Sequence, residues 1–301
     1  MRRYLAAVGL LLVIGVSLAA PSPAAEAIKL RTTAPIYVEG KGSGIRQPEG
    51  VGCGKGQLVI ADTGNGRILR YAITGTSLTP DASFVLPQLP YPIRAQIDSK
   101  GEIYVLDGKL RRIGRVSPSG EFLGYVGLQG ITGGTIVPRS IRIGRDDELY
   151  LLDVFSARVL VLDPAGKVRR EIPFPGEFGF FSDLAVDPGG KVFLIDSVGK
   201  RVFAATKEDS VFKAASEGLE EHVSFPTSLA VDGKGYIYVI DQNGSGIVIL
   251  GPDGSFRGRH LGMGWKDGFL RYPAQACIDE NGNFFIANRE NNRVEVLSTA
   301  Q

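Results

Sequence analysis

Two sets of polar side chains recur along this sequence. The first is an Asp or Asn that ends an apolar segment and is followed five residues later by Arg in all copies but one. A carboxylate at a strand end accepts backbone N–H groups, and an Arg across the next loop can pair with it. Because every copy uses these residues, we interpret them as structural clamps. The pairs are Asp62/Arg67, Asp107/Arg112, Asp153/Arg158 and Asp196/Arg201, while Asp241 lacks its Arg and Arg293 stands five residues after Asn288 in the last copy.

The second set occupies positions that differ from copy to copy, where a specific function is better sought. One shared position reads Gly50, Arg94, Ser140, Asp183, Ser228 and Gln275, and neighbouring positions add Glu49, Arg139 and Arg142. Side chains of both charges suit a small ligand or an ion. A water-filled channel with balanced charges would use the same residues, and we favour that interpretation. The candidate ligand-binding residues are Glu49, Arg94, Arg139, Arg142, Asp183 and Gln275.

Most common catalytic and cofactor sites are excluded by composition. The chain has 2 His, too few for a three-His zinc site, and no C-x-x-C-H to attach a c-type haem. No G-x-S-x-G, phosphate-binding loop or Cys/His cluster occurs. Lys+Arg 34 against Asp+Glu 32 gives a formal charge of +2, which does not favour a nucleic acid partner. We therefore expect no catalytic residue, no metal, no cofactor and no enzyme activity.

The 2 Cys residues, Cys53 and Cys277, lie in the first and last copies of the repeat described below. When each position is counted back from the turn that follows its strand, the two side chains point from opposite faces of their sheets. Neighbouring blades face each other through opposite faces, so this arrangement allows the two Cys side chains to meet. Stacked sheets lie about 10 Å apart, whereas a disulfide needs Cα atoms about 4.4 to 6.8 Å apart. A disulfide and a pair of buried free thiols therefore both remain open.

A sixfold repeat positions all these residues. Segments 56–62 (GQLVIAD), 101–107 (GEIYVLD), 147–153 (DELYLLD), 190–196 (GKVFLID), 235–241 (GYIYVID) and 282–288 (GNFFIAN) end at spacings of 45, 46, 43, 45 and 47 residues. A proline opens most copies, and Asp- and Gly-containing turns separate β-branched and aromatic runs. This pattern predicts an all-β, six-bladed β-propeller of four-stranded antiparallel blades.

The domain boundaries follow from the same repeat. Residues 1–27 are predicted to be a signal peptide, with Arg2 and Arg3 before an apolar run and a small-x-small cleavage pattern at 25–27. Residues 28–301 form the propeller, and residues 28–41 complete the last blade and cover its edge. We expect a periplasmic or secreted protein with no membrane span after signal removal. The repeats lie near 42–83, 84–130, 131–175, 176–220, 221–264 and 265–301.

The repeat pattern resembles the NHL-repeat family of six-bladed β-propellers, in its exported bacterial type, most fully in residues 226–247 and 273–296. The resemblance implies a non-catalytic binding or scaffold module for protein–protein interaction, with another envelope or extracellular protein as partner. One alternative is a metal-dependent lactonase-like hydrolase at the axial channel mouth, where Glu49 and Asp183 would supply two ligands but no Asn completes the set. Lyase-like relatives use several histidines around zinc, and His222 and His260 are too few. The other alternative is a carbohydrate-binding or cell-surface structural protein.

Aromatic residues crowd two linkers between repeats. The family buries one aromatic residue ahead of the leading proline, so the resemblance implies that Phe178 and Phe269 lie in the core. Aromatic side chains on loops of a rigid scaffold are typical partner anchors. We therefore expect Phe180 and Trp265 to be partner-contact residues.

Overall fold

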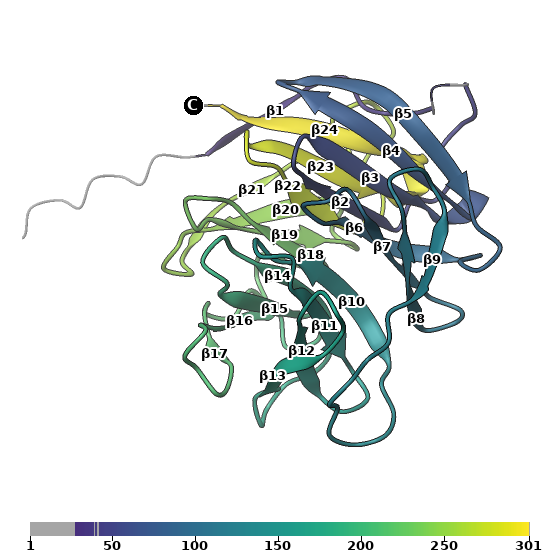
Figure 1. Ribbon diagram of the computed structural model, residues 1–301. Helices are drawn as coiled ribbons and strands as arrows, with labels where there is room; N and C mark the ends of the chain where they lie inside the picture. The colour runs from purple at the N-terminus through teal and green to yellow at the C-terminus, as the bar shows by residue number, and fades with distance from the viewer. Residues whose placement is uncertain (1–27, 39, 41, 301) are drawn as a thin grey trace, which may run out of the picture.

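The computed structural model describes residues 28–38, 40 and 42–300. These residues form six four-stranded antiparallel sheets (Figure 1). The first strand of each sheet contacts the first strands of the neighbouring sheets, and the contact between blades one and six closes the ring. The predicted six-bladed β-propeller is therefore confirmed.

Each of blades one to five follows chain order from the axis outwards. Blade one contains β2 (Gly50–Gly54), β3 (Gln57–Asp62), β4 (Arg67–Thr74) and β5 (Ser77–Val85). Blade two contains β6 (Pro92–Ile97), β7 (Ile103–Asp107), β8 (Arg112–Val116) and β9 (Phe122–Tyr125). Blade three contains β10 (Pro138–Ile143), β11 (Leu149–Asp153), β12 (Arg158–Leu162) and β13 (Val168–Pro173). Blade four contains β14 (Phe181–Val186), β15 (Val192–Asp196), β16 (Arg201–Ala205) and β17 (Lys213–Ala214). Blade five contains β18 (Pro226–Val231), β19 (Ile237–Asp241), β20 (Gly246–Leu250) and β21 (Phe256–His260).

Blade six combines the two ends of the described chain. It contains β22 (Ala276–Ile278), β23 (Asn283–Asn288) and β24 (Arg293–Ala300), and its outer strand is β1 (Lys29–Thr32). β1 pairs antiparallel with β24, with Leu30 opposite Thr299, and the two strands lie side by side in Figure 1. A further bridge joins Ile36 to Val294. The N-terminal segment thus covers the edge that β24 would otherwise expose.

The core lies between adjacent blades. The second strands are buried on both faces, which explains why they read as continuous apolar runs rather than as an alternation. Tyr238 of blade five and Phe284 of blade six, for example, are both fully buried, with ring centroids 5.3 Å apart. Six apolar clusters of this kind fill the spaces around the ring.

The repeated Asp clamps are only partly as predicted. The Asp62–Arg67 and Asp153–Arg158 pairs form, at 2.6 and 3.3 Å. Within the described residues, Arg112 and Arg201 do not pair with Asp107 and Asp196. The Asp107 carboxylate instead accepts backbone N–H groups from both neighbouring loops, and that of Asp196 does the same. The recurring carboxylate therefore serves the loop backbone in blades two and four without a bond to the arginine five residues on.

Asp241, which lacks the Arg five residues on, acquires a different cation. Arg259 of the outer strand β21 reaches its carboxylate at 2.9 Å. This buried Asp is therefore also structural.

The predicted signal peptide, residues 1–27, lies outside the described residues. Within the described part of the chain, none of the helices has the length and apolar character needed to cross a membrane.

Candidate functional site

The inner strands bring the candidate ligand-binding residues together near the axis of the ring. Arg94 on β6, Arg142 on β10 and Asp183 on β14 are all buried. The proline or Phe181 that opens each of strands β6, β10, β14 and β18 is followed by a register shift against the next strand. Each shift places the varied positions at the same level of the ring.

Asp183 is the centre of a buried polar cluster. Its carboxylate accepts hydrogen bonds from Ser140, from Ser228 (2.6 Å) and from Arg142 Nη2 (2.9 Å). Burial alone would raise the pKa of this carboxyl, but the charges of Arg142 and Arg94, together with the two hydroxyl groups, hold the pKa below its ordinary value. Asp183 is therefore a fixed anion that holds Arg142 in place.

Arg94 and Arg139 lie next to this cluster. Arg94 Nη1 donates to the carbonyl oxygens of Glu49 (3.0 Å) and Ile93 (2.8 Å). The Arg139 guanidinium lies 5.8 Å from the ring centroid of Phe180. Burial, followed by the charge of Arg94, lowers the pKa of Arg139. Arg94 is thus buried and Arg139 half-buried, and the charge of Arg94 acts on Arg139.

Glu49 and Gln275 lie on the side of the ring where blades one and six meet. The Glu49 carboxylate pairs with Arg289 at 3.2 Å, and the Glu49 side chain is 25% exposed. The amide oxygen of Gln275 accepts the N–H of Val51 at 3.0 Å. Glu49 therefore provides a part-exposed carboxylate that pairs with Arg289, while its backbone carbonyl accepts from Arg94.

Sequence reasoning missed Arg289. Arg289 directly follows Asn288. The residues at the same position as Arg289 in the other repeats are Thr63, Gly108, Val154, Ser197 and Gln242. Thr63 and Ser197 donate from this position to the carbonyl oxygens of Pro92 and Pro226, which open the next inner strands. Comparing this position across repeats would therefore have placed Arg289 near the axis.

A divalent cation of the lactonase kind does not fit these residues. Asp183 is already bonded to Arg142 and two hydroxyls, and Glu49 is paired with Arg289. The surrounding arginines would repel a cation. No group of three His, Cys, Asp or Glu side chains suited to a metal occurs in the described part of the chain.

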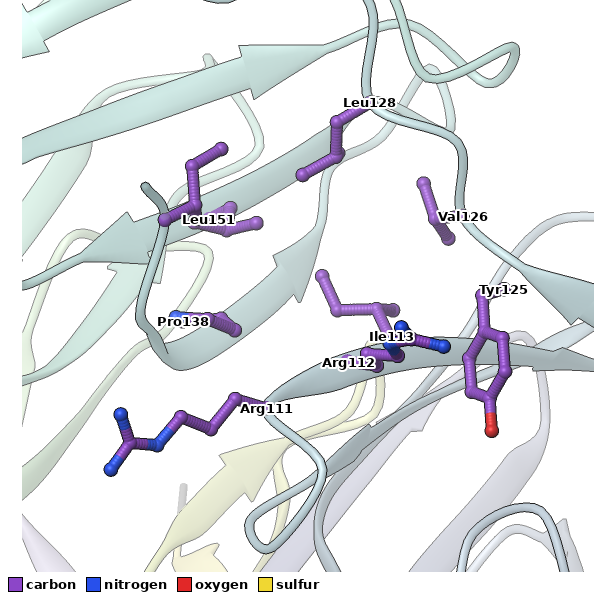
Figure 2. Close-up of a pocket in the computed structure, with 9 residues that line it drawn as sticks. Arg111, Arg112, Ile113, Tyr125, Val126, Leu128, Pro138 and Leu151 are labelled. Carbon is purple, nitrogen blue, oxygen red and sulfur yellow. The ribbon is translucent and has the colours of Figure 1, made fainter. Parts of the chain in front are cut away.

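A hollow of about 280 Å³ lies away from the axial cluster, between blades two and three. Figure 2 shows Ile113, Leu128 and Leu151 converging on it, while the Arg111 guanidinium extends away. The Arg112 guanidinium lies 5.0 Å from the ring centroid of Tyr125. This lining offers apolar contact but no pair of groups for acid–base chemistry, so the axial cluster is the better candidate.

The linker aromatics differ from expectation. Phe178 and Phe269, predicted to be core residues, are 42% and 44% exposed. Phe174 and Phe181 fill the buried positions near Phe178 instead, and Phe178 stacks on Phe181 from outside. Trp265 is 70% exposed, and the Arg271 guanidinium carbon lies 3.5 Å from the centroid of its ring. Phe180 is also exposed and faces Arg139.

Cys53 and Cys277 are joined in a disulfide with Cα atoms 5.9 Å apart. They lie on the inner strands β2 and β22, where the first and last blades come closest. The bond therefore fastens the seam of the ring from the inside, while β1 fastens it from the outside.

No protein-family model and no curated protein sequence matches this chain. Solved structures do match it over most of its length. A gluconolactonase from Xanthomonas campestris is 14% identical, with a TM-score of 0.65 over 93% of this chain and 99% of that chain. A streptogramin B lyase is 13% identical, with a TM-score of 0.59 over 93% of this chain and 100% of that one. A virginiamycin B lyase from Staphylococcus aureus is 14% identical, with a TM-score of 0.60 over 90% and 99%.

These likenesses establish the propeller fold. They also contradict our expectation that the chain is not an enzyme, because propellers of the same architecture are named as a lyase and a gluconolactonase. The expectation rested on the missing metal ligands, but a missing metal set excludes one mechanism and leaves other chemistry open. At these identities the comparisons transfer no activity.

Proposed function

We propose that this chain is an enzyme that cleaves an ester or lactone bond in a small molecule at the axial mouth of the ring, without a divalent metal. One observation carries the proposal: the part-exposed Glu49 carboxylate lies at a mouth to which the buried Arg94 and the half-buried Arg139 also contribute. The lactonase and lyase names of proteins with the same fold support it. The repeat motifs support placing the chain in the NHL-repeat group.

The arrangement supplies the two functions that such a reaction needs. Glu49 Oε1 is bonded to Arg289, so Oε2 would accept a proton from water as the water oxygen adds to the carbonyl carbon. The electron pair of the C=O bond would move to the carbonyl oxygen, and Arg139 and Arg94 would stabilise that oxyanion. When the C=O bond reforms, the C–O bond to the leaving alcohol breaks, and Glu49 returns the proton to the leaving oxygen. Asp183 would act as a positioning residue, because it holds Arg142 without facing the reacting atoms.

The cellular setting remains a prediction. A periplasmic or secreted location is supported by the leader sequence and by the Cys53–Cys277 disulfide, since disulfides persist in oxidising compartments. An envelope or extracellular protein partner also stays a prediction. Its best candidate contact is the exposed Trp265.

The test is initial-rate hydrolysis of glucono-δ-lactone and a panel of aryl esters by the mature chain. We expect turnover that falls at least 100-fold in Glu49→Gln, since the proton acceptor is lost. Glu208→Gln, on an exposed turn, is the matched control and should retain full activity. Absence of turnover on the whole panel, or equal rates in native protein and Glu49→Gln, would contradict the proposal.

A further inference from the structure

We infer that the axial mouth contains a seat for a small oxyanion, a carboxylate or phosphate group of the ligand, formed by Arg94, Arg139 and Gln275. The inference rests on the proposed function and deepens it, because it specifies that the substrate or product is an organic anion. It is argued from hydrogen-bond donors that the fold buries without acceptors.

Three donors of this kind lie on or next to the inner strands of blades two, three and six. Arg94 Nε, Arg139 Nε and Gln275 Nε2 are each buried and lack a hydrogen-bond acceptor among the described residues. Arg94 is 4% exposed and Gln275 is fully buried. Buried donors are nearly always paired in folded proteins, because leaving one unpaired forfeits its bond to water. Arg158, Arg257 and Arg289 also bury such a donor, but Arg94, Arg139 and Gln275 share a position on the inner side of the ring, where an acceptor from outside the chain could serve all three.

Gly50 explains why the Gln275 amide lies close to the backbone of Arg94. It occupies the ring position between Arg94 and Gln275, and a Cβ built on it would lie 2.9 Å from the Arg94 Cα and 3.1 Å from Gln275 Oε1. The lack of a side chain at Gly50 therefore lets the backbone of Ile93 and Arg94 and the Gln275 amide come close to the same point of the ring. Gln275 crosses this position to accept the N–H of Val51, which leaves its NH₂ group as the free end.

The charges favour an anion. Asp183 already accepts from Ser140, Ser228 and Arg142, so its oxygens are occupied. Glu49 is paired with Arg289. Arg94 and Arg139 therefore lack a carboxylate partner among the described residues. Guanidinium groups present N–H donors in a planar fork that matches the oxygens of a carboxylate or phosphate.

The experiment is isothermal titration of the mature, disulfide-bonded chain with gluconate, inorganic phosphate and neutral glucose. We expect gluconate or phosphate to bind and glucose not to bind. Binding should weaken as salt is added, because the interaction is ionic. The anion that binds identifies which oxyanion the seat prefers. Failure of both anions to bind at millimolar concentration would overturn the inference.

Two variants locate the seat. Gln275→Glu keeps an oxygen for the Val51 N–H but replaces the free NH₂ with a carboxylate oxygen, so anion affinity should fall at least 10-fold. Arg139→Gln should give a similar loss, and Arg145→Gln, on an exposed loop, should not. The melting temperature of each variant shows that it folds. Undiminished affinity in Gln275→Glu would refute the seat even if Arg139→Gln did not fold.

The inference and the proposed function fail separately. Anion binding without turnover on the lactone and ester panel would remove the enzyme proposal and leave the seat. Turnover without anion binding would leave the enzyme and remove the seat.

Discussion

Breaking the Cys53–Cys277 disulfide should destabilise the propeller strongly, because the bond closes almost the whole ring. The two cysteines are 224 residues apart in sequence. Cross-linking a loop of that length removes chain entropy from the unfolded state that corresponds to about 5 kcal/mol at 25 °C. For a domain of this size, the same free energy corresponds to a fall in melting temperature on the order of 10 °C.

The assay compares native protein with Cys53→Ala/Cys277→Ala by calorimetry, with and without reductant. The reductant should lower the melting temperature of native protein and leave that of the variant unchanged, since the variant has no bond to reduce. Alkylation in denaturant followed by mass spectrometry should add no alkyl group before reduction and two after it. A native melting temperature that is insensitive to complete reduction would refute the reasoning, because the loop would then contribute nothing.

Two further predictions concern the axis and the seam. Asp183→Asn leaves Arg142 buried without its counter-ion. Unfolding in urea at pH 7 should therefore show a free energy of unfolding lower by about 3 to 5 kcal/mol. The control Asp146→Asn, at an exposed position, should change it by less than about 0.5 kcal/mol. The folded-state pKa of Asp183 lies below its ordinary value, so the stabilisation is present above the unfolded pKa of about 4 and is lost as the pH falls through the folded-state pKa. The deficit of Asp183→Asn should therefore shrink in acid, and a deficit that is constant with pH would contradict the ion-pair account. Deleting residues 28–38 removes the strand that covers β24, so the melting temperature should fall and aggregation should increase. A deletion variant with the same melting temperature as the undeleted chain would show that closure by β1 is unimportant.

The propeller could be predicted from the sequence because its signal is repeated. Each repeat has the same pattern of strands and turns. The pattern is weak in any single repeat, but six copies at similar spacing specify one architecture. The closing strand was also predicted, since residues 28–41 precede the first repeat and β1 pairs with β24. The disulfide could not be decided in this way. The alternation of side chains along a strand gave the correct faces for Cys53 and Cys277. The 5.9 Å between their Cα atoms depends on how far the inner strands converge at the axis.

The candidate site was only partly predictable. The varied position on the inner strands identified Arg94, Asp183 and Gln275, because the repeat fixed their level in the ring. It did not show which groups would pair. Asp183 was weighed as a metal ligand, but Ser140, Ser228 and Arg142 occupy its oxygens. Such pairing depends on side-chain reach between blades, which sequence spacing does not encode.

The exposed linker aromatics were misjudged for a related reason. Phe178 and Phe269 sit ahead of a leading strand, as the family pattern requires, yet both are exposed. Phe174, Phe181 and Phe203 occupy the interior near Phe178, and Phe178 stacks on Phe181 from outside. Competition among neighbouring aromatics decided which of them is buried.

The most direct test of the central claim, a metal-independent catalytic site at the axial mouth, is the rate of lactone or ester hydrolysis after exhaustive treatment with EDTA. We predict turnover by the mature chain that EDTA leaves unchanged and that falls at least 100-fold in Arg139→Gln, with Arg145→Gln equal to native protein. Turnover that disappears with EDTA and returns with added Ca²⁺ or Zn²⁺, or turnover that is unaffected in Arg139→Gln, would contradict the claim.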